Sequence, residues 1–332
     1  MNFVSERSDD FAWANGRWQR RHEIHIPLDD LGIRQAVIAV ERLRQYHGQW
    51  WQVDRHCARL ASTLDAMGID SKHGDVCFDV LVDLPGRQEG PASKKLNPNA
   101  TSDQSENFSW GATILVTPGS SHPPAGVSSP SESNAETGKS ITNSGTKAAP
   151  RQIVLPHRIE TRVVRQRQQF GQPLVVTDVR QPPPESWPRS IKTRCRLHYF
   201  LADQQAHARQ PGASGLLLDD DGSVTETSIA NVAMVTAGKI FSPPAQRVLP
   251  GISQAVTHEI AQSLGIDWEA EPIFPAALQQ ADEVLLMGTD TGIWFASRVD
   301  TAAISNGRPG PVFRRLRAAW ERRSRLWPEH GR

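Results

Sequence analysis

Hydrophobic and polar positions in the first half of this chain follow the patterns of short strands at two places. Asn15-Gly16 separates FAWA from RWQRR, and this dipeptide is typical of the two-residue turn of a β-hairpin. The run around Trp110–Val116 is rich in β-branched and aromatic residues and predicts a further strand. Residues 37–44 are compatible with either a strand or a helix. The first half is therefore predicted to be an α+β structure.

The clearest helical pattern of the first half lies between Asp54 and Met67. Asp54 is a residue type that caps helices, and Gly68 stands where glycine often ends them. Apolar residues recur between these limits at three- and four-residue spacing: Cys57, Leu60, Ala61, Leu64 and Met67. The pattern predicts a helix over 54–67 with one buried face.

After about residue 165 the pattern changes to many short strands with interleaved helices. Strands are expected, in chain order, in PLVVTDV, GLLLD, SVTETS, NVAMVT, KIFS, EVLLM and IWFASRV. Asp221-Gly222 and Ala237-Gly238 are turn signals between consecutive strands. Helices are predicted over Leu197–Arg209 and from Ile252 to Leu264.

The C-terminal sequence VFRRLRAAWERRSRLW predicts a basic amphipathic helix. Its apolar residues Val312, Leu316 and Trp320 are spaced so that they share one face. We expect this face to dock on the protein, so that the arginines face water and contact neither a membrane nor nucleic acid.

Two segments have a composition that is foreign to a packed domain. Residues 88–108 and 119–150 are dominated by Ser, Pro, Asn, Gly, Thr and Ala, and the second offers only Val127 and Ile141 as large aliphatic residues. Such segments cannot bury enough apolar surface to offset the entropy lost on ordering. Both are therefore predicted to be disordered surface insertions that flank the strand around Trp110.

Length and composition narrow the class of protein. The chain has 332 residues, of which 38% are hydrophobic, and this suggests two domains with real cores. Lys+Arg 37 against Asp+Glu 36 gives a net charge of +1, so nothing demands a nucleic-acid partner. No stretch approaches the ~20 uninterrupted apolar residues of a membrane span, and the N-terminus lacks the pattern of a secretory signal. We expect a soluble protein without a membrane partner.

The cysteines indicate the compartment. Cys57, Cys77 and Cys195 form neither a close pair nor a CxxC motif. An odd, sparse set of cysteines favours a reducing environment without a disulfide framework or a structural zinc site. The sequence therefore predicts a cytoplasmic protein that holds no metal.

Four features of the second half together fit one cofactor. Lys192 follows a Pro-rich loop and precedes a helix, and Glu226 is a carboxylate in mid-strand between two threonines. LPGIS (249–253) and GTDT (288–291) place small residues at a helix start and at a turn, where backbone N–H groups can hold an anion. A lysine, a carboxylate and two anion sites are what pyridoxal phosphate requires.

The same segments resemble the class IV pyridoxal-phosphate aminotransferases, which include branched-chain aminotransferases, D-amino-acid aminotransferases and aminodeoxychorismate lyase. The resemblance rests on PRSIKTRCRLHYFLADQQA, GLLLDDDGSVTETSIANVAMV, KIFSPPAQRVLPGISQAV and ADEVLLMGTDTGIWFASRVD. In the first half, WWQVDRHCARLASTLDAMGI is similar to the family's F-x-L-x-x-H-x-x-R-L helix. Asp30, Gly32 and Glu41 echo the family's D-x-G…E pattern. The resemblance covers nearly everything except the two insertions.

The resemblance implies a two-domain α/β fold, the fold-type IV of the D-amino-acid aminotransferases, with the cofactor between the domains. We expect an N-terminal α+β domain over 11–165 and a C-terminal cofactor-binding α/β domain over 170–320. The resemblance also implies a homodimer with its sites near the interface. The reaction that it implies is transamination between an amino acid and a 2-oxo acid, as in the branched-chain aminotransferases.

Site residues follow from the matching motifs. Lys192 matches the lysine that forms the internal Schiff base, and Glu226 matches the carboxylate that binds the pyridine nitrogen. Burial beside a cationic cofactor would favour the neutral amine that Lys192 needs, and an ionised Glu226 would keep the pyridine nitrogen protonated. The positions that match the family's phosphate-binding residues are Arg59, Ile252, Ser253 and Thr289.

The chain departs from the family pattern at four positions. Leu197 stands where branched-chain enzymes have Tyr, and Cys195 stands where Asn is frequent. Ala36 replaces the second glycine of the D-x-G-x-x-x-G pattern. Asp290 follows Thr289 where small neutral residues are common, and its charge would oppose a substrate carboxylate at this turn unless its side chain points away.

Two other functions are compatible with these residues. The first is elimination of pyruvate from aminodeoxychorismate by a lyase that uses the same site. The second is a non-catalytic relative that keeps the fold as a binding or dimerisation module. Gly288-Thr289 favours the transferase, since lyases of that type tend to lack Gly-Thr at this turn. The presence of both Lys192 and Glu226 favours an enzyme over the non-catalytic module.

Overall fold

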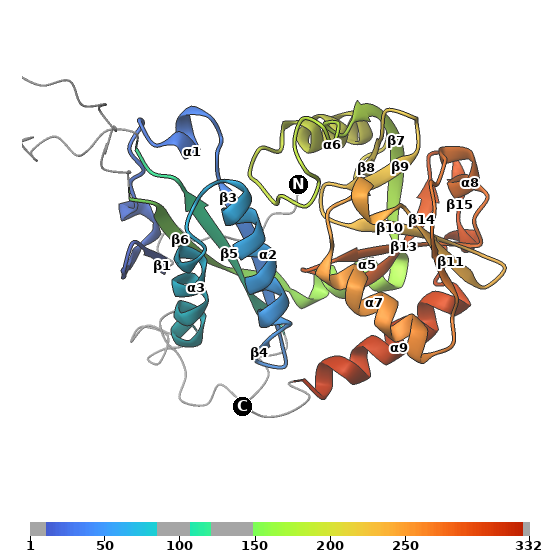
Figure 1. Ribbon diagram of the computed structural model, residues 1–332. Helices are drawn as coiled ribbons and strands as arrows, with labels where there is room; N and C mark the ends of the chain where they lie inside the picture. Colours follow the sequence, from blue (N-terminus) through green and yellow to red (C-terminus); the bar gives the residue numbers. More distant parts are fainter. Residues whose placement is uncertain (1–10, 85–106, 121–148, 328–332) are drawn as a thin grey trace, which may run out of the picture.

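The computed structural model describes residues 11–84, 107–120 and 149–327. Within these ranges the chain forms two β-sheets with helices packed against them, and Figure 1 shows the smaller, N-terminal sheet beside the larger one. The predicted mixture of strands and helices is confirmed. The two predicted insertions fall almost wholly outside the described residues. At their edges, Phe108 begins a strand and Ser120 bridges to Asp30.

The N-terminal sheet is antiparallel, and its described strands run in the order β2-β1-β6-β5-β3-β4. Asn15 and Gly16 both have positive φ, as the predicted hairpin turn requires. Residues 37–44, compatible with either structure, lie mostly in a strand. The strands are β1 (Phe11–Ala14), β2 (Arg17–Arg20), β3 (Ala39–Tyr46), β4 (Gln49–Trp50), β5 (Phe108–Thr117) and β6 (Arg151–Glu160).

Helices α1 (Leu31–Arg34), α2 (Val53–Ala66) and α3 (Lys72–Asp79) accompany this sheet, with short 3₁₀ turns at Arg21–Glu23 and Val80–Asp83. Helix α2 buries Leu60 and Leu64 in a core that it shares with the sheet, as its spacing predicts. The prediction that Asp54 caps α2 is wrong, because the helix begins at Val53 and its N-cap is Gln52. Asp54 lies inside the first turn, where its charge favours the positive end of the helix dipole.

Several described elements have no counterpart among the sequence predictions, and the longest of them are β6, α3 and α5 (Thr161–Phe170). Pro156 makes β6 hard to predict from the sequence, because proline lacks the backbone N–H that a central strand uses for hydrogen bonding to one of its neighbours. The structure tolerates Pro156 since the register of β6 with β1 covers only Ile153 and Val154. Helix α5 then leads into the second sheet.

The second sheet is mixed, and within the described residues its strands run β12-β11-β10-β13-β14-β7-β8-β9, with β15 beside β14. Strand β7 pairs in parallel with β8 and β14, whereas the hairpins predicted at Asp221-Gly222 and Ala237-Gly238 are antiparallel. The strands are β7 (Gln172–Arg180), β8 (Ser214–Leu218), β9 (Val224–Thr227), β10 (Asn231–Thr236), β11 (Lys239–Ser242), β12 (Trp268–Ala270), β13 (Glu283–Gly288), β14 (Gly292–Val299) and β15 (Ala302–Ala303).

Helices α6 (Leu197–Arg209), α7 (Ile252–Ser263), α8 (Pro275–Gln279) and α9 (Pro311–Arg325) pack around this sheet (Figure 1), with 3₁₀ turns at Ala245–Arg247 and Ser305–Gly307. The docking predicted for α9 is confirmed, since Val312, Leu316 and Trp320 are buried in the core that covers one face of the sheet. None of the helices in the described part of the chain is long and apolar enough to cross a membrane.

Side chains from both sheets meet at their junction. Trp51 packs in the core of the second sheet, with its ring centroid 5.7 Å from that of Trp320. Trp327 donates a hydrogen bond to the carbonyl of Trp50 at 3.0 Å. Arg55 of α2 forms an ion pair with Glu259 of α7 at 2.5 Å. The two sheets are therefore held in one arrangement by apolar and charged contacts.

Ala36 lies just after α1 with a φ of 55°, a conformation that glycine adopts without steric cost. This is the position at which the family pattern has a glycine. A Cβ in the left-handed region costs about 1–2 kcal/mol, so the substitution stores local strain.

Replacing Ala36 by glycine should therefore raise the free energy of unfolding by about 0.5–1 kcal/mol, because relief of the strain outweighs the added entropy of the unfolded chain. Denaturant unfolding of the purified protein measures it. The matched control is Ala58→Gly on the exposed side of α2, where the same change should cost about 1 kcal/mol. A lower free energy of unfolding for Ala36→Gly would contradict the inference that the backbone of Ala36 is strained.

Candidate active site

Lys192 lies at the junction of the two sheets, on a segment that pairs with the edge of β3. Its carbonyl accepts a hydrogen bond from the backbone N–H of Val40 at 2.9 Å, and its own N–H donates to Thr63 Oγ1 at 3.3 Å. The next residue, Thr193, forms a β-bridge with Ala39. The backbone of Lys192 is thus fixed by β3 and α2, while α6 begins shortly after it.

The amine of Lys192 is poised to lose its proton near neutral pH. Burial, together with the charge of Arg59, lowers the pKa of Lys192 to about 8, although Glu41 and Glu226 act in the opposite direction. Within the described ranges no carboxylate lies within ion-pair distance of this amine. A lysine that is desolvated in this way can act as a nucleophile or a base.

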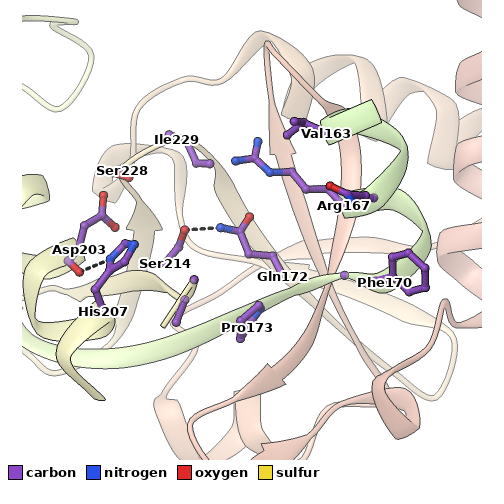
Figure 2. A pocket seen from close by; sticks show the side chains of 14 residues that line it. Val163, Arg167, Phe170, Gln172, Pro173, Asp203, His207, Ser214, Ser228 and Ile229 are labelled. Atoms are coloured by element: carbon purple, nitrogen blue, oxygen red, sulfur yellow. Dashed lines mark hydrogen bonds between the residues drawn. The ribbon is translucent and has the colours of Figure 1, made fainter. Parts of the chain in front are cut away.

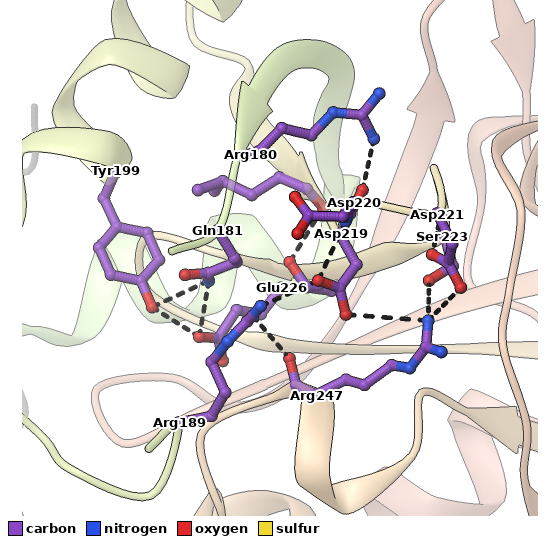
Figure 3. Close-up of polar contacts among 12 residues, drawn as sticks. Arg180, Gln181, Arg189, Tyr199, Asp219, Asp220, Asp221, Ser223, Glu226 and Arg247 are labelled. Carbon is purple, nitrogen blue, oxygen red and sulfur yellow. Dashed lines mark hydrogen bonds and ion pairs between the residues drawn. The ribbon is translucent and has the colours of Figure 1, made fainter. Parts of the chain in front are cut away.

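Glu226 lies in β9 and is almost fully buried. Its carboxylate accepts hydrogen bonds from Tyr199 Oη at 2.5 Å and Gln181 Nε2 at 3.1 Å (Figure 3). The backbone N–H of Leu249 donates a third hydrogen bond at 3.3 Å. The amide of Asn231, its register partner in β10, adds a longer contact of 3.4 Å. Donors from several elements therefore converge on one carboxylate.

Burial raises the pKa of Glu226 above its usual value, although hydrogen bonds from Tyr199 and Leu249 and the charges of Lys192 and Arg196 oppose the shift. Among the described residues, no basic side chain lies within ion-pair distance of this carboxylate. A buried carboxylate with hydrogen bonds but no counter-ion is costly, unless a cation is bound beside it.

The sequence reasoning missed Tyr199, Gln181 and Asn231. The family pattern points to position 197 for an aromatic residue in α6, but Leu197 stands there and its side chain is largely exposed. Tyr199, two residues further along, supplies the phenol instead. Burial and the charge of Glu226 raise the pKa of Tyr199 well above its usual value, so its hydroxyl stays protonated and donates. The sequence signal for this residue is a tyrosine in the first turn of the predicted helix.

Arg59 of α2 is held by Glu41 of β3 in a bidentate ion pair. The Nε–Oε2 distance is 2.9 Å and the Nη2–Oε1 distance is 2.6 Å. Glu41 is fully buried and also accepts from His56 Nδ1 at 3.0 Å. The charge of Arg59 and the hydrogen bonds from His56 and Arg59 hold the pKa of Glu41 far below its usual value despite the burial, so the carboxylate stays ionised. The guanidinium of Arg59 is thereby fixed in orientation.

The start of α7 lies next to Arg59, whose Nη1 donates to the carbonyl of Pro250 at 2.9 Å. Ile252 and Ser253 are the first residues of this helix, and no side chain caps their N–H groups. Gly251 is required here, because a Cβ would lie only 1.9 Å from Asn231 Oδ1. The structure therefore brings Arg59, Ile252 and Ser253 together, and Asn231 links them to Glu226.

Thr289 lies in the turn between β13 and β14. This turn comes shortly after Met287, the residue of β13 that pairs with Asn231 of β10. Its neighbour Gly288 packs against the carbonyl of Ile229, where a Cβ would be 2.3 Å from the oxygen. Within the described residues, Thr289 forms no hydrogen bond or ion pair with Arg59 or Lys192. The side chain of Asp290 is turned toward Arg42 of β3, with an Nη2–Oδ2 distance of 2.6 Å.

Comparison with known proteins gives the family. The model of the class IV amino-transferases matches residues 39–299. The chain is 23% identical to a D-alanine aminotransferase of Bacillus licheniformis over 311 residues, 92% of this chain and 94% of the relative. It is 30% identical to branched-chain-amino-acid aminotransferase-like protein 2 of Arabidopsis thaliana over 149 residues, 45% of this chain, but spans only 26% of that relative.

The fold is that of a solved branched-chain amino acid aminotransferase from Thermobaculum terrenum in its PLP-form. The TM-score is 0.73 at 17% sequence identity, covering 96% of this chain and 95% of the other. The predicted fold-type IV architecture is therefore confirmed. With the match of the family model over most of its length, this chain belongs to the class IV aminotransferases.

Proposed function

We propose that this protein is a pyridoxal-phosphate-dependent aminotransferase that acts on an amino acid and a 2-oxo acid, in the manner of branched-chain aminotransferases. The single observation that supports this most is that Lys192 and Glu226, both without an ion-pair partner in the described part of the chain, line the same pocket with Tyr199 and Leu249. Membership of the family and the names of the relatives agree with this proposal.

The residues present fit pyridoxal phosphate. A protonated pyridine nitrogen is the cation that a buried Glu226 lacks, and the α7 start beside Arg59 suits a phosphate. When bound, the cofactor supplies an aldehyde that carries the amino group and a ring that accepts electrons from the substrate. We propose that the cofactor attaches covalently to Lys192 and that Glu226 orients the pyridine ring.

Lys192 would be the residue that moves protons. Because its pKa is lowered to about 8, about a tenth of its amine is neutral at pH 7, far more than for an ordinary lysine, and this neutral form can accept a proton at Nζ. Glu226 would remain ionised once a cation faces it, and the hydroxyl of Tyr199 would hold its Oε1 in place. The phosphate would be bound by the Arg59 guanidinium, the N–H groups of Ile252 and Ser253, and Thr289.

We also propose two domains, over 11–165 and 170–320. This division is supported by the positions of the sheets, since β6 ends at Glu160 and β7 begins at Gln172. The compartment proposed is the cytoplasm, where Cys57, Cys77 and Cys195 would stay reduced as the free thiols that they are here.

We further propose a homodimer that forms over an exposed apolar face. Leu197 and Phe200 are exposed along one side of α6, and Leu201 adjoins them. Further along this side, Asp203 and His207 line a hollow of about 390 Å³ whose rim includes the exposed Phe170 and Ile229 (Figure 2). Exposed apolar residues that cluster in this way are typical of protein interfaces. A second copy of the chain is the occupant we assign to this face.

The proposed function predicts how cofactor attachment depends on pH. Apo-protein mixed with pyridoxal phosphate and borohydride should become labelled at Lys192, and the initial rate should rise with pH to half its maximum near pH 8, because only the neutral amine attacks. Mass spectrometry locates the label. The label should be absent from Lys192→Ala. Lys239→Ala, which removes a half-exposed lysine, is the matched control and should keep the label.

The loaded protein should then convert amino donors to 2-oxo acids in single-turnover experiments, and Lys192→Ala should not. Label on another lysine would remove Lys192 from the proposal. Release of pyruvate from aminodeoxychorismate without any transamination would contradict the aminotransferase and identify the lyase instead.

The homodimer is tested by charge substitutions on the apolar face. Phe200→Glu should weaken dimerisation at least tenfold, since a buried unpaired charge costs more than about 1.4 kcal/mol. Phe274→Glu introduces the same charge at an exposed phenylalanine that precedes α8 and should leave the dimer intact. Sedimentation velocity measures both. A monomeric wild-type protein, or equal behaviour of the two variants, would overturn the assignment of this face.

A further inference from the structure

The two ionisable groups of the proposed site are fixed to different sheets. The backbone of Lys192 is hydrogen-bonded to Val40 of β3, and Arg194 donates its N–H to the carbonyl of Ile38, just before β3, at 3.0 Å. Glu226, in contrast, lies in β9, a strand of the second sheet. A cofactor that is attached to Lys192 and faces Glu226 depends on both sheets, so the spacing between the two residues has to be held.

Arg189, three residues before Lys192, links this segment to the second sheet. Its Nη2 donates to Asp219 Oδ1 at 2.9 Å, and its Nη1 donates to the carbonyl of Arg247 at 3.0 Å (Figure 3). The side chains of Arg189 and Asp219 are only 4% and 10% exposed, so water screens this ion pair little. Within the described ranges Nε of Arg189 has no hydrogen-bond partner, so the two Nη contacts hold the guanidinium.

Both acceptors of Arg189 belong to segments that carry groups of the proposed cofactor site. Asp219 directly follows β8 and precedes β9, the strand of Glu226. Arg247 ends the 3₁₀ turn that precedes α7, and its side chain pairs with Asp221 of the β8–β9 turn. One side chain therefore connects the segment of Lys192 with the hairpin of Glu226 and with the approach to the helix start proposed for the phosphate.

A second arginine links the other side of Lys192 to the same strand. Arg196, four residues after Lys192, donates from Nη2 to the carbonyl of Ser228, which directly follows β9. Its guanidinium also lies over the ring of Tyr199, 4.4 Å from the centroid, and Tyr199 donates to Glu226. The two arginines thus lie on either side of Lys192 in the sequence, and their acceptors lie on either side of Glu226.

We propose that Arg189 is a positioning residue that keeps Glu226 aligned with a cofactor attached to Lys192, and that Asp219 is the counter-ion that holds Arg189 in place. A guanidinium paired with a carboxylate is a directional contact, and burial makes its loss costly. Both Nη groups are engaged by protein acceptors, so Arg189 acts through Lys192 and Glu226. Without this link, the segment of Lys192 would follow the N-terminal sheet while Glu226 follows the second sheet. This inference rests on the proposed function.

The test is a double-mutant cycle on the dissociation constant of pyridoxal phosphate, measured by equilibrium dialysis. In the otherwise unchanged protein, Glu226→Gln should weaken binding about 10- to 100-fold, since a charge-assisted hydrogen bond to the ring nitrogen is lost. In an Arg189→Gln or Asp219→Asn background the same change should cost less than about threefold, because the carboxylate is no longer aligned. Arg209→Gln is the matched control: Arg209 also binds a carboxylate and a carbonyl, but at the surface, and should leave the full cost.

An equal cost of Glu226→Gln in all backgrounds would overturn the proposal, because Arg189 would then only stabilise the fold. Thermal unfolding shows whether each variant is folded. Hydrogen exchange of the full chain without cofactor is a second measurement. Asp219→Asn should speed exchange of the N–H groups of Ile191 and Lys192 at least about fivefold, since the segment is released. No such increase would overturn the link as well, whereas the increase in a protein that binds no pyridoxal phosphate would contradict the proposed function.

Discussion

Glu226 is buried and Lys192 is half-buried, and neither has an ion-pair partner in the described structure. The other residues of the site are arranged around these two ionisable groups. Taking a charge out of water costs several kcal/mol when nothing compensates it. The protein meets this cost in two ways. Lys192 gives up its proton more readily, and Glu226 collects hydrogen bonds from Tyr199, Gln181 and the N–H of Leu249.

The N-terminal sheet contributes the charges that frame this pocket. On one side of β3, buried Glu41 fixes the guanidinium of Arg59 beside the start of α7. On the other side, Arg42 pairs with Asp290 in the turn after β13. Neighbouring residues of one strand thus reach two elements beside the second sheet, the start of α7 and the β13–β14 turn, because side chains alternate along a strand. The packing of the two sheets against each other is therefore a condition for the site.

The sequence predicts the hairpins, α6 with its limits, α7 and the docked face of α9, because each has a strong local pattern. The sequence pattern does not reveal β6, which Pro156 interrupts, and it points to Asp54 as a cap although Gln52 occupies the N-cap position. The matching motifs point to Lys192, Glu226 and Arg59 as site residues, but not to the side chains that hold them. Tyr199 contacts Glu226 across 27 positions of the chain, and Asn231 joins Glu226 to Leu249 only when β9, β10 and the segment before α7 pack together. Local sequence patterns do not encode such contacts.

The protonation state of the cofactor's ring nitrogen tests the pairing with Glu226 most directly. Pyridoxal phosphate labelled with a nitrogen isotope in the ring, bound to the protein and observed by NMR, reports whether this nitrogen is protonated. In the wild type it should be protonated at neutral pH, and in Glu226→Gln, with Tyr199 retained, it should lose the proton. An unprotonated nitrogen in the wild type, or the same spectrum in both proteins, would contradict the role assigned to Glu226.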